Sequence, residues 1–384
     1  MKHIKDNSIL LFFLIALSLS ACIETYDLPV TEASSSYLVV EGVISEGESS
    51  VTLTRTSTLN SGFTRHEKNA TVQIENQRGD ASITLIEVDS GQYRASMDLD
   101  RNEQYRLKIY TADDKEYVSA FVPVLTTPQV DSVTWSVVNN NGIQLYVTTH
   151  DPQSNTRYYR WTYEETWQDR SPFNSFLEYV DHEIVSRDFP LNQINICWKE
   201  ASSTRILTSS SVKLQEDVIY KQPLLFINTD NSPKLDVKYS LLVRQYAITK
   251  EAFEFWDLLR NNSEELGTLF DAQPSQLFGN ISCTTNPDEP VIGFVSAGTV
   301  SEKRIFIRRN EVPLSLPYNR YVTCATDTIA DYPEALEEAF ALGDSIPVNV
   351  YIDMGGNVNY LSSSRYCVDC RARGGTNVQP DFWE

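Results

Sequence analysis

Alternation of apolar and polar residues dominates the chain after residue 36. Val72 and Ile74 alternate with polar neighbours, and so do Tyr105, Leu107 and Ile109. Period-two patterning with β-branched and aromatic residues is typical of strands with one buried face. Turn clusters such as Gln77-Arg78-Gly79-Asp80 separate these short runs. The pattern therefore predicts that residues 37–125 form an N-terminal β-sandwich of immunoglobulin-like or transthyretin-like type.

Residues 126–384 continue the same pattern beyond a linker that contains Pro123 and Pro128. Two alternating runs flank the segment 139–142, which ends in Asn141-Gly142 and predicts a hairpin because both residues tolerate positive φ. Further runs follow at 159–167, 235–243, 305–307 and 348–350. We therefore predict an all-β protein in which a larger β-rich domain, with one or two helices, follows the sandwich.

One helix is predicted at 249–266. Thr249 can cap it, Phe253 and Trp256 are spaced for one face, and Gly267 can end it. The aromatic face favours packing against a sheet, as a core brace, over binding a partner helix. Residues 333–342 predict a second, shorter helix.

The N-terminal segment has the features of a lipoprotein signal. Lys2 and Lys5 precede an apolar run at 8–18, which is too short to span a membrane, and Leu19-Ser20-Ala21-Cys22 follows. We predict that residues 1–21 are removed and that the Cys22 thiol carries the lipid. An ordinary secretory signal with an incidental cysteine is the alternative. Residues 22–36 predict a tether, and two or more acyl chains give stable anchoring.

The chain is strongly acidic, with a formal net charge of −20. Such a charge repels nucleic acid and anionic lipid surfaces, so neither is an expected partner. Solubility of an exposed protein is a sufficient reason for the acidity.

Five cysteines follow Cys22, and an exported protein can form disulfides. We predict two bridges among Cys283, Cys324, Cys367 and Cys370, which would staple a C-terminal loop at 367–383, with Cys197 as a buried free thiol. A bridge between Cys367 and Cys370 is not expected, because that spacing gives a strained bond typical of redox proteins. Zinc-site and redox-motif interpretations of Cys367-x-x-Cys370 remain as alternatives.

Residues for catalysis or metal binding do not form recognisable motifs. His66, His150 and His182 are scattered, and no H-E-x-x-H or G-x-S-x-G pattern occurs. Acidic pairs lack the spacing of a calcium-binding loop. We therefore predict no catalytic residue, metal or cofactor. The aromatics at every second position in 159–167 indicate a buried sheet face, with a carbohydrate platform as the alternative.

Several blocks resemble a known family. They include Leu38-Val39-Val40-Glu41-Gly42, Tyr159-Arg160-Trp161, Val243-Arg244-Gln245-Tyr246-Ala247, Asn286-Pro287-Asp288-Glu289-Pro290 and the C-terminal Cys367-Val368-Asp369-Cys370-Arg371 with Pro380-Asp381-Phe382-Trp383. Together they resemble the domain of unknown function family 4249, which comprises lipoproteins of Bacteroidota. The resemblance implies an outer-membrane lipoprotein encoded beside TonB-dependent receptors. It implies no established activity and no catalytic residues.

These observations predict a non-enzymatic lipoprotein anchored in the outer membrane, at the cell surface or on the periplasmic face. It would bind a ligand or dock on a TonB-dependent transporter as an accessory. A structural role in envelope assembly without a small ligand is one alternative. A hydrolase of extracellular polymers, using His66, His150 or His182, is another.

Overall fold

A computed structural model of the chain describes residues 36–57, 64–188, 191–230, 232–263, 279–313, 315–316 and 323–383. The predicted signal at 1–21, the predicted lipid-attachment residue Cys22 and nearly all of the predicted tether lie outside the described residues. Within those residues, the fold is mostly β, as the sequence predicts. No helix among them is long and apolar enough to cross a membrane.

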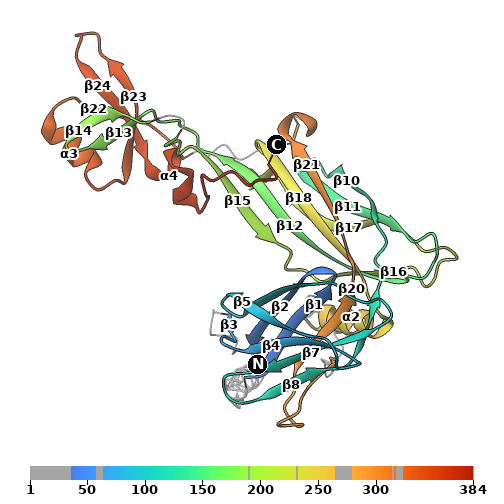
Figure 1. Cartoon of the computed structure of the whole chain (residues 1–384). Helices are drawn as coiled ribbons and strands as arrows, with labels where there is room; N and C mark the ends of the chain where they lie inside the picture. The colour runs from blue at the N-terminus through green and yellow to red at the C-terminus, as the bar shows by residue number, and fades with distance from the viewer. Residues whose placement is uncertain are drawn as a thin grey trace, which may run out of the picture. The chain divides into compact units, whose positions relative to one another are not determined.

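The N-terminal sandwich is built from eleven paired strands whose pairing closes into a ring. Its strands are β1 (Leu38–Ser45), β2 (Gly47–Arg55), β3 (Arg65–His66), β4 (Thr71–Asn76), β5 (Ser82–Asp89), β6 (Gln92–Met97), β7 (Gln104–Tyr110), β8 (Glu116–Ser119), β9 (Val122–Leu125), β19 (Ile281–Cys283) and β20 (Ile292–Gly298) (Figure 1). The ring runs β7-β4-β5-β6-β2-β1-β20-β9 and returns to β7. The alternating residues Val72, Ile74, Tyr105, Leu107 and Ile109 are all buried in its core, as predicted.

A late segment of the chain completes this sandwich. Strand β20 lies parallel to β1 and also pairs with β9, and β19 pairs with β8. A contiguous domain ending at residue 125 is therefore incomplete, because β1 would pair only with β2 and become an exposed edge strand. Periodicity cannot reveal this return, since it shows that a strand exists and not which strand it joins.

A buried ion-pair network connects this late segment to the first strands of the sandwich. Arg55 on β2 lies 2.6 Å from Glu67 and 3.7 Å from Glu289, which follows β19. Tyr117 and Lys115 also contact the Glu289 carboxylate, at 2.7 and 2.8 Å. Burial alone would raise the pKa of Glu289, but the hydrogen bonds from Lys115 and Tyr117 outweigh it and hold the pKa below its usual value.

The middle sandwich packs two sheets face to face. Its strands are β10 (Val130–Val138), β11 (Gly142–His150), β12 (Tyr158–Arg170), β15 (Ile196–Ser202), β16 (Leu207–Ser210), β17 (Val218–Asn228), β18 (Lys238–Ala247) and β21 (Val300–Arg308), with 3-10 turns at Pro233–Leu235 and Arg309–Glu311. One sheet has the order β10-β11-β17, and the other has β15-β12-β18-β21 with β16 beside β12. Tyr159, Trp161 and Tyr163 are buried between the sheets, so the aromatic run is core, as predicted.

The predicted hairpin at 139–142 forms, but its turn is centred one step earlier than Asn-Gly. Asn139 and Asn140 both have a φ of 52°, and the Asn141 N–H donates to the Val138 carbonyl over 3.3 Å. Asparagine tolerates the left-handed region because its side chain is short and polar. Gly142 instead begins β11, where a Cβ atom would lie 2.3 Å from the Ile227 carbonyl oxygen.

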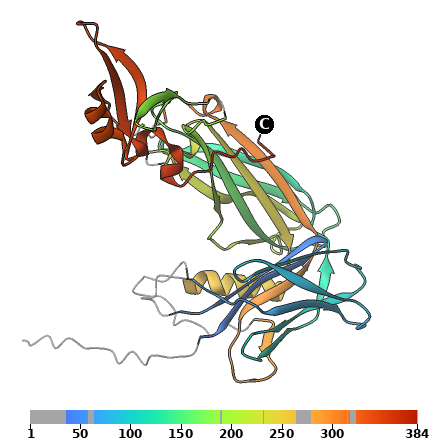
Figure 2. The ribbon, with the colours of Figure 1, turned by 60° about the vertical axis from the view of Figure 1, so that its left-hand side comes forward.

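Helix α2 (Lys250–Ser263) joins the two sandwiches (Figure 2). The Thr249 hydroxyl accepts from the Ala252 N–H, so the predicted cap is present. Phe255 and Trp256 are buried against Phe294 of β20, while the helix also packs on β12 and β16. The helix is therefore a core brace, as predicted, although Phe255 takes the buried place expected for Phe253. The expected end at Gly267 lies outside the described residues.

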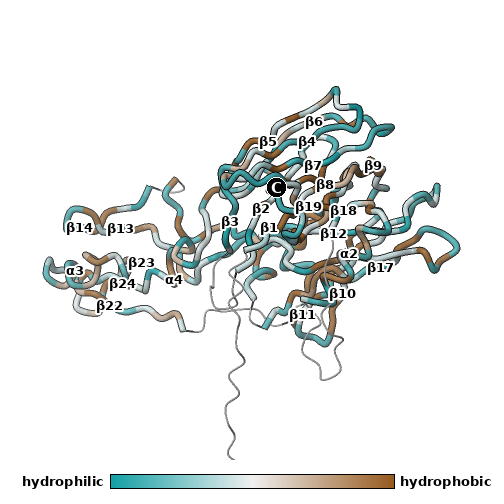
Figure 3. The backbone as a smooth tube through the Cα atoms, turned by 90° about the horizontal axis from the view of Figure 1, so that it is seen from below, coloured by the Kyte–Doolittle hydropathy of each residue, from teal (hydrophilic) through white to brown (hydrophobic). Residues whose placement is uncertain are grey.

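A third group of elements forms a separate lobe. It comprises β13 (Leu177–Val180), β14 (Glu183–Ser186), β22 (Asp327–Ala330), α3 (Pro333–Phe340), β23 (Ser345–Ile352) and β24 (Val358–Ser364). Strands β22, β24 and β23 form one sheet, β13 lies against β23, and α3 packs on β22 and β23. The predicted second helix is thus confirmed as α3. In Figure 3, brown apolar stretches occur in this lobe as well as in the two sandwiches.

Candidate functional site

A groove of about 890 Å³, which we call the junction groove, is hollowed into the described part of the chain. It lies where strands of the N-terminal sandwich meet the sheet of β12 and β18. Its charged lining residues are Glu41, Glu46, Glu48, Arg94, Arg160, Glu164, Arg244 and Glu302, and its hydroxyl groups come from Ser45, Ser50, Thr52, Thr162, Tyr163, Ser202, Ser203 and Tyr246. The walls are therefore mainly polar.

Arg244 is held at the groove by two carboxylates. Its Nη1 donates to Glu164 Oε1 over 2.5 Å, and its Nε donates to Glu302 Oε1 over 2.6 Å. Arg244 pairs directly with Glu302 across β18 and β21, while Glu164 lies on β12. Burial alone lowers the pKa of Arg244, but these hydrogen bonds and charges outweigh it and raise the pKa. Two carboxylates around one guanidinium leave one negative charge uncompensated.

Arg160 lies on the same sheet as Arg244, on the neighbouring strand, and links three elements. It lies on β12, donates to Glu41 of β1 over 2.7 Å, and stacks 4.0 Å from the ring centre of Trp256 on α2. The Arg160 side chain is buried while Glu41 is exposed. Arg160 and Glu41 therefore form a charged contact between the two sandwiches, with the aromatic ring supporting the guanidinium.

An apolar pocket adjoins the groove but is very small. Tyr246, Trp256 and Phe294 are among its lining residues, and its volume is about 10 Å³. That is about the space of one water molecule. This small pocket therefore has no room for a solute, whereas the polar groove does.

The structure corrects the predicted disulfides. Cys197 is bonded to Cys370, and Cys324 is bonded to Cys367. Cys283 is the free cysteine in the described residues, and it is buried in the core of the N-terminal sandwich. The prediction failed for Cys283 and Cys197 because the chain returns to the first domain at 281–298, which carries Cys283 away from the other cysteines. Cys367 and Cys370 do not pair with each other, as predicted.

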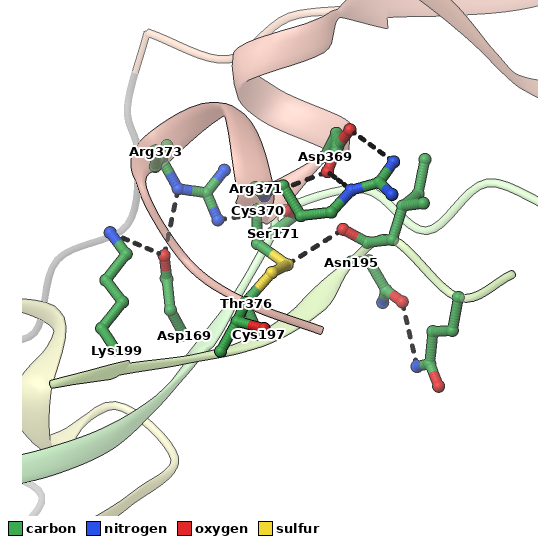
Figure 4. Close-up of a disulfide and its surroundings, with 12 residues drawn as sticks. Asp169, Ser171, Asn195, Cys197, Lys199, Asp369, Cys370, Arg371, Arg373 and Thr376 are labelled. Atoms are coloured by element: carbon green, nitrogen blue, oxygen red, sulfur yellow. Dashed lines mark hydrogen bonds and ion pairs between the residues drawn. A yellow bond between two sulfur atoms is a disulfide. The ribbon is translucent and has the colours of Figure 1, made fainter. Parts of the chain in front are cut away.

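The predicted C-terminal loop is stapled, but part of it is helical, with α4 (Arg365–Val368) and a 3-10 turn at Cys370–Arg373. Figure 4 shows the turn against β15, where Arg373 points toward Asp169 and Ser171. The buried Asp169 carboxylate lies 3.2 Å from Arg373 Nε and 3.1 Å from Lys199 Nζ. Beyond the turn, Thr376 pairs with Trp198 of β15. The segment therefore fixes the lobe to the middle sandwich.

The three histidines are exposed and belong to different groups of elements. His66 lies on β3, His150 is 2.8 Å from Asp131, and His182 is 2.7 Å from Glu337 in the lobe. None of them lines the junction groove. Among the described residues, no three His, Cys, Asp or Glu side chains gather as metal ligands.

Arg160 and Arg244 were not singled out as site residues from the sequence. The sequence does contain a feature that could identify them. Each is a charged residue inside a long alternating strand, next to buried neighbours such as Trp161 and Val243. A charge in such a strand needs a partner, which here comes from another element.

Comparisons with known proteins give one family and distant structural likenesses. A two-domain fibronectin type III segment from chicken tenascin is 11% identical with a TM-score of 0.17, covering 56% of this chain and 93% of that one. A putative membrane anchored protein from Corynebacterium diphtheriae is 12% identical with a TM-score of 0.17, covering 67% and 60%. No curated protein matches the chain.

A family model matches residues 23–304, which end before the Cys367–Trp383 block and before the sheet of the lobe. The match covers well over half of the chain. The chain therefore belongs to the family described as Domain of unknown function (DUF4249).

Proposed function

We propose that this protein is a non-enzymatic lipoprotein, anchored through Cys22 in the outer membrane, that serves a TonB-dependent transporter by binding a polar solute in the junction groove. The Leu19-Ser20-Ala21-Cys22 signal and the family resemblance support the location and the partner. The observation that carries the binding role is the groove itself, because its volume of about 890 Å³ suits a small ligand.

The lining of the groove indicates the class of solute. Hydroxyl groups and carboxylates offer hydrogen bonds, and Glu164 with Glu302 leaves a net negative charge beside Arg244. A solute rich in hydrogen-bond donors, such as an oligosaccharide or a cationic peptide, fits these walls better than an apolar one. An envelope-assembly protein without a ligand would not need such a groove.

Thermal unfolding in the presence of neutral oligosaccharides and of lysine-containing dipeptides tests the binding role. One of the two classes should raise the melting temperature, since a ligand that binds only the folded state stabilises it. The rise should disappear in Glu302→Gln and persist in Glu254→Gln, which changes an exposed ion pair with Lys250 on α2, away from the groove. Equal shifts in both variants would place binding elsewhere.

The transporter role needs a separate measurement. Tagged protein purified from outer membranes of its host should recover a TonB-dependent β-barrel, and Cys22→Ala should abolish that recovery because the variant lacks the anchor. Recovery of no such barrel by the lipidated protein would contradict the accessory role, whatever the groove binds.

A further inference from the structure

The lobe, taken here as residues 176–186 and 325–364, has an unusually apolar surface. Of the twenty large apolar side chains exposed in the described part of the chain, ten lie in this small lobe. Five of them gather at the end of the β23–β24 hairpin: Val350, Tyr351, Ile352, Met354 and Val358. Concentrated apolar surface of this kind marks interaction sites in soluble proteins.

The tip of the hairpin is held in a defined conformation. Ile352 pairs with Val358 across the strands, just beyond the end of β22. Asp353 Oδ1 accepts from the backbone N–H groups of Gly355 and Asn357, over 2.8 and 2.9 Å, and Oδ2 accepts from the Asn357 side chain. These bonds order the turn that carries Met354, which is fully exposed. An apolar tip that is already ordered loses little conformational entropy on binding.

The net charge of the segment that carries this tip restricts what can cover it. Residues 325–364 contain seven Asp and Glu and no Lys, Arg or His. An anionic lipid surface would be repelled by this charge, and so would the same face of a second copy of the chain. A protein surface with Lys and Arg around an apolar recess is complementary to it.

We propose that the β23–β24 tip inserts into an apolar recess, bordered by Lys and Arg, on a protein partner. Ile352, Met354 and Val358 fill the recess, and the surrounding carboxylates fix its orientation. The inference rests on the accessory role proposed above only in naming the TonB-dependent transporter as the partner. The groove plays no part in it.

Photo-crosslinking in host outer membranes tests the contact. A benzophenone amino acid placed at Met354 should crosslink one protein, and the same group at Ile86 should not. Ile86 is the matched control because it is an exposed apolar residue on β5 of the N-terminal sandwich. The crosslinked peptide of the partner should contain apolar residues next to Lys or Arg. A crosslink to phospholipid, to a second copy, or to nothing would overturn the proposal.

The second test measures the affinity of the protein for the partner that crosslinking identifies. Met354→Asp should weaken binding about thirty-fold, the size expected for a hot-spot residue, while Ile86→Asp should leave it unchanged. Added salt should weaken the complex of the unaltered protein, since screening reduces the attraction between charges. Equal affinities for the two variants would overturn the proposal even if a partner were captured.

The outcomes separate the two proposals. A partner that is crosslinked from position 354 but is no TonB-dependent transporter supports the docking tip and contradicts the accessory role. A transporter recovered with unchanged affinity for Met354→Asp supports the accessory role and contradicts the docking tip.

Discussion

Cys197 on β15 is bonded to Cys370 in the C-terminal 3-10 turn, across a sequence separation of 173 residues. Cys370 is also close in sequence to Cys367, whose bridge to Cys324 lies at the base of the lobe. Cys367 and Cys370 therefore belong to two separate crosslinks, although only two residues lie between them. One closes the lobe, and the other attaches the lobe to the middle sandwich.

Removal of the long crosslink should destabilise the protein. Loop-closure entropy for a span of 173 residues predicts a loss of up to about 5 kcal/mol in the double variant Cys197→Ala/Cys370→Ala. The double variant avoids leaving a free thiol. Urea unfolding followed by circular dichroism measures the change.

Cys283→Ala provides the control, because Cys283 is buried but makes no disulfide. It should cost only the small packing loss of one sulfur atom, about 1 kcal/mol. A double variant no less stable than Cys283→Ala would show that the long crosslink does not support the fold.

The buried Asp169 carboxylate should matter as much as the nearby crosslink. Asp169→Asn keeps the shape of the side chain but removes the buried negative charge that Arg373, itself buried, and Lys199 contact. Breaking a buried ion pair in this way costs about 3–5 kcal/mol. Glu254→Gln, in the exposed pair with Lys250, should have little effect. Equal unfolding midpoints for the two variants would contradict this assignment.

The sequence predicts the parts of the fold that depend on local pattern. Tyr159, Trp161 and Tyr163 are buried on one sheet face because the side chains of a strand alternate between its faces. The Thr249 cap and α3 follow from local preferences in the same way. These predictions require no knowledge of which strands pair.

The remaining features depend on contacts between distant residues. Glu289 approaches Arg55, and Cys283 enters the first core, because β20 returns to β1. The junction groove needs Glu41 from the first domain and Arg160 from the second. Such sites are created by topology, which one sequence with period-two patterning leaves open.

The pKa of His150 should lie above the ordinary value of 6.5. Its ring is exposed, and the hydrogen bond and charge of Asp131 raise the pKa. A raised folded-state pKa gives stabilisation that is fully present below pH 6.5 and is lost as the pH rises through the folded-state value. NMR titration of the imidazole should show a fall in Asp131→Asn and no change in Asp80→Asn. A titration that is unchanged in Asp131→Asn would contradict this.

The first domain should fold only when both of its chain segments, the early one and the late one, are present. Five residues of its core, Ile281, Cys283, Val291, Val295 and Ala297, come from the late segment. A fragment of residues 36–125 loses them, exposes the β1 edge, and leaves Arg55 without Glu289. The loss of this apolar burial alone costs about several kcal/mol, which is comparable with the whole free energy of unfolding of a domain of that size.

We therefore expect residues 36–125 alone to be unfolded or aggregated, with poorly dispersed amide signals in NMR. Joining residue 125 through a flexible Gly/Ser linker to residues 279–299 should restore a dispersed spectrum, because β19 and β20 can then pair with β8 and β1. Gly293→Val in the joined fragment should abolish the recovery. Gly293 has a φ of 147°, and a Cβ atom there would lie 2.1 Å from the Val40 carbonyl oxygen. Folding of residues 36–125 by themselves would show that β20 only covers a domain that is already complete.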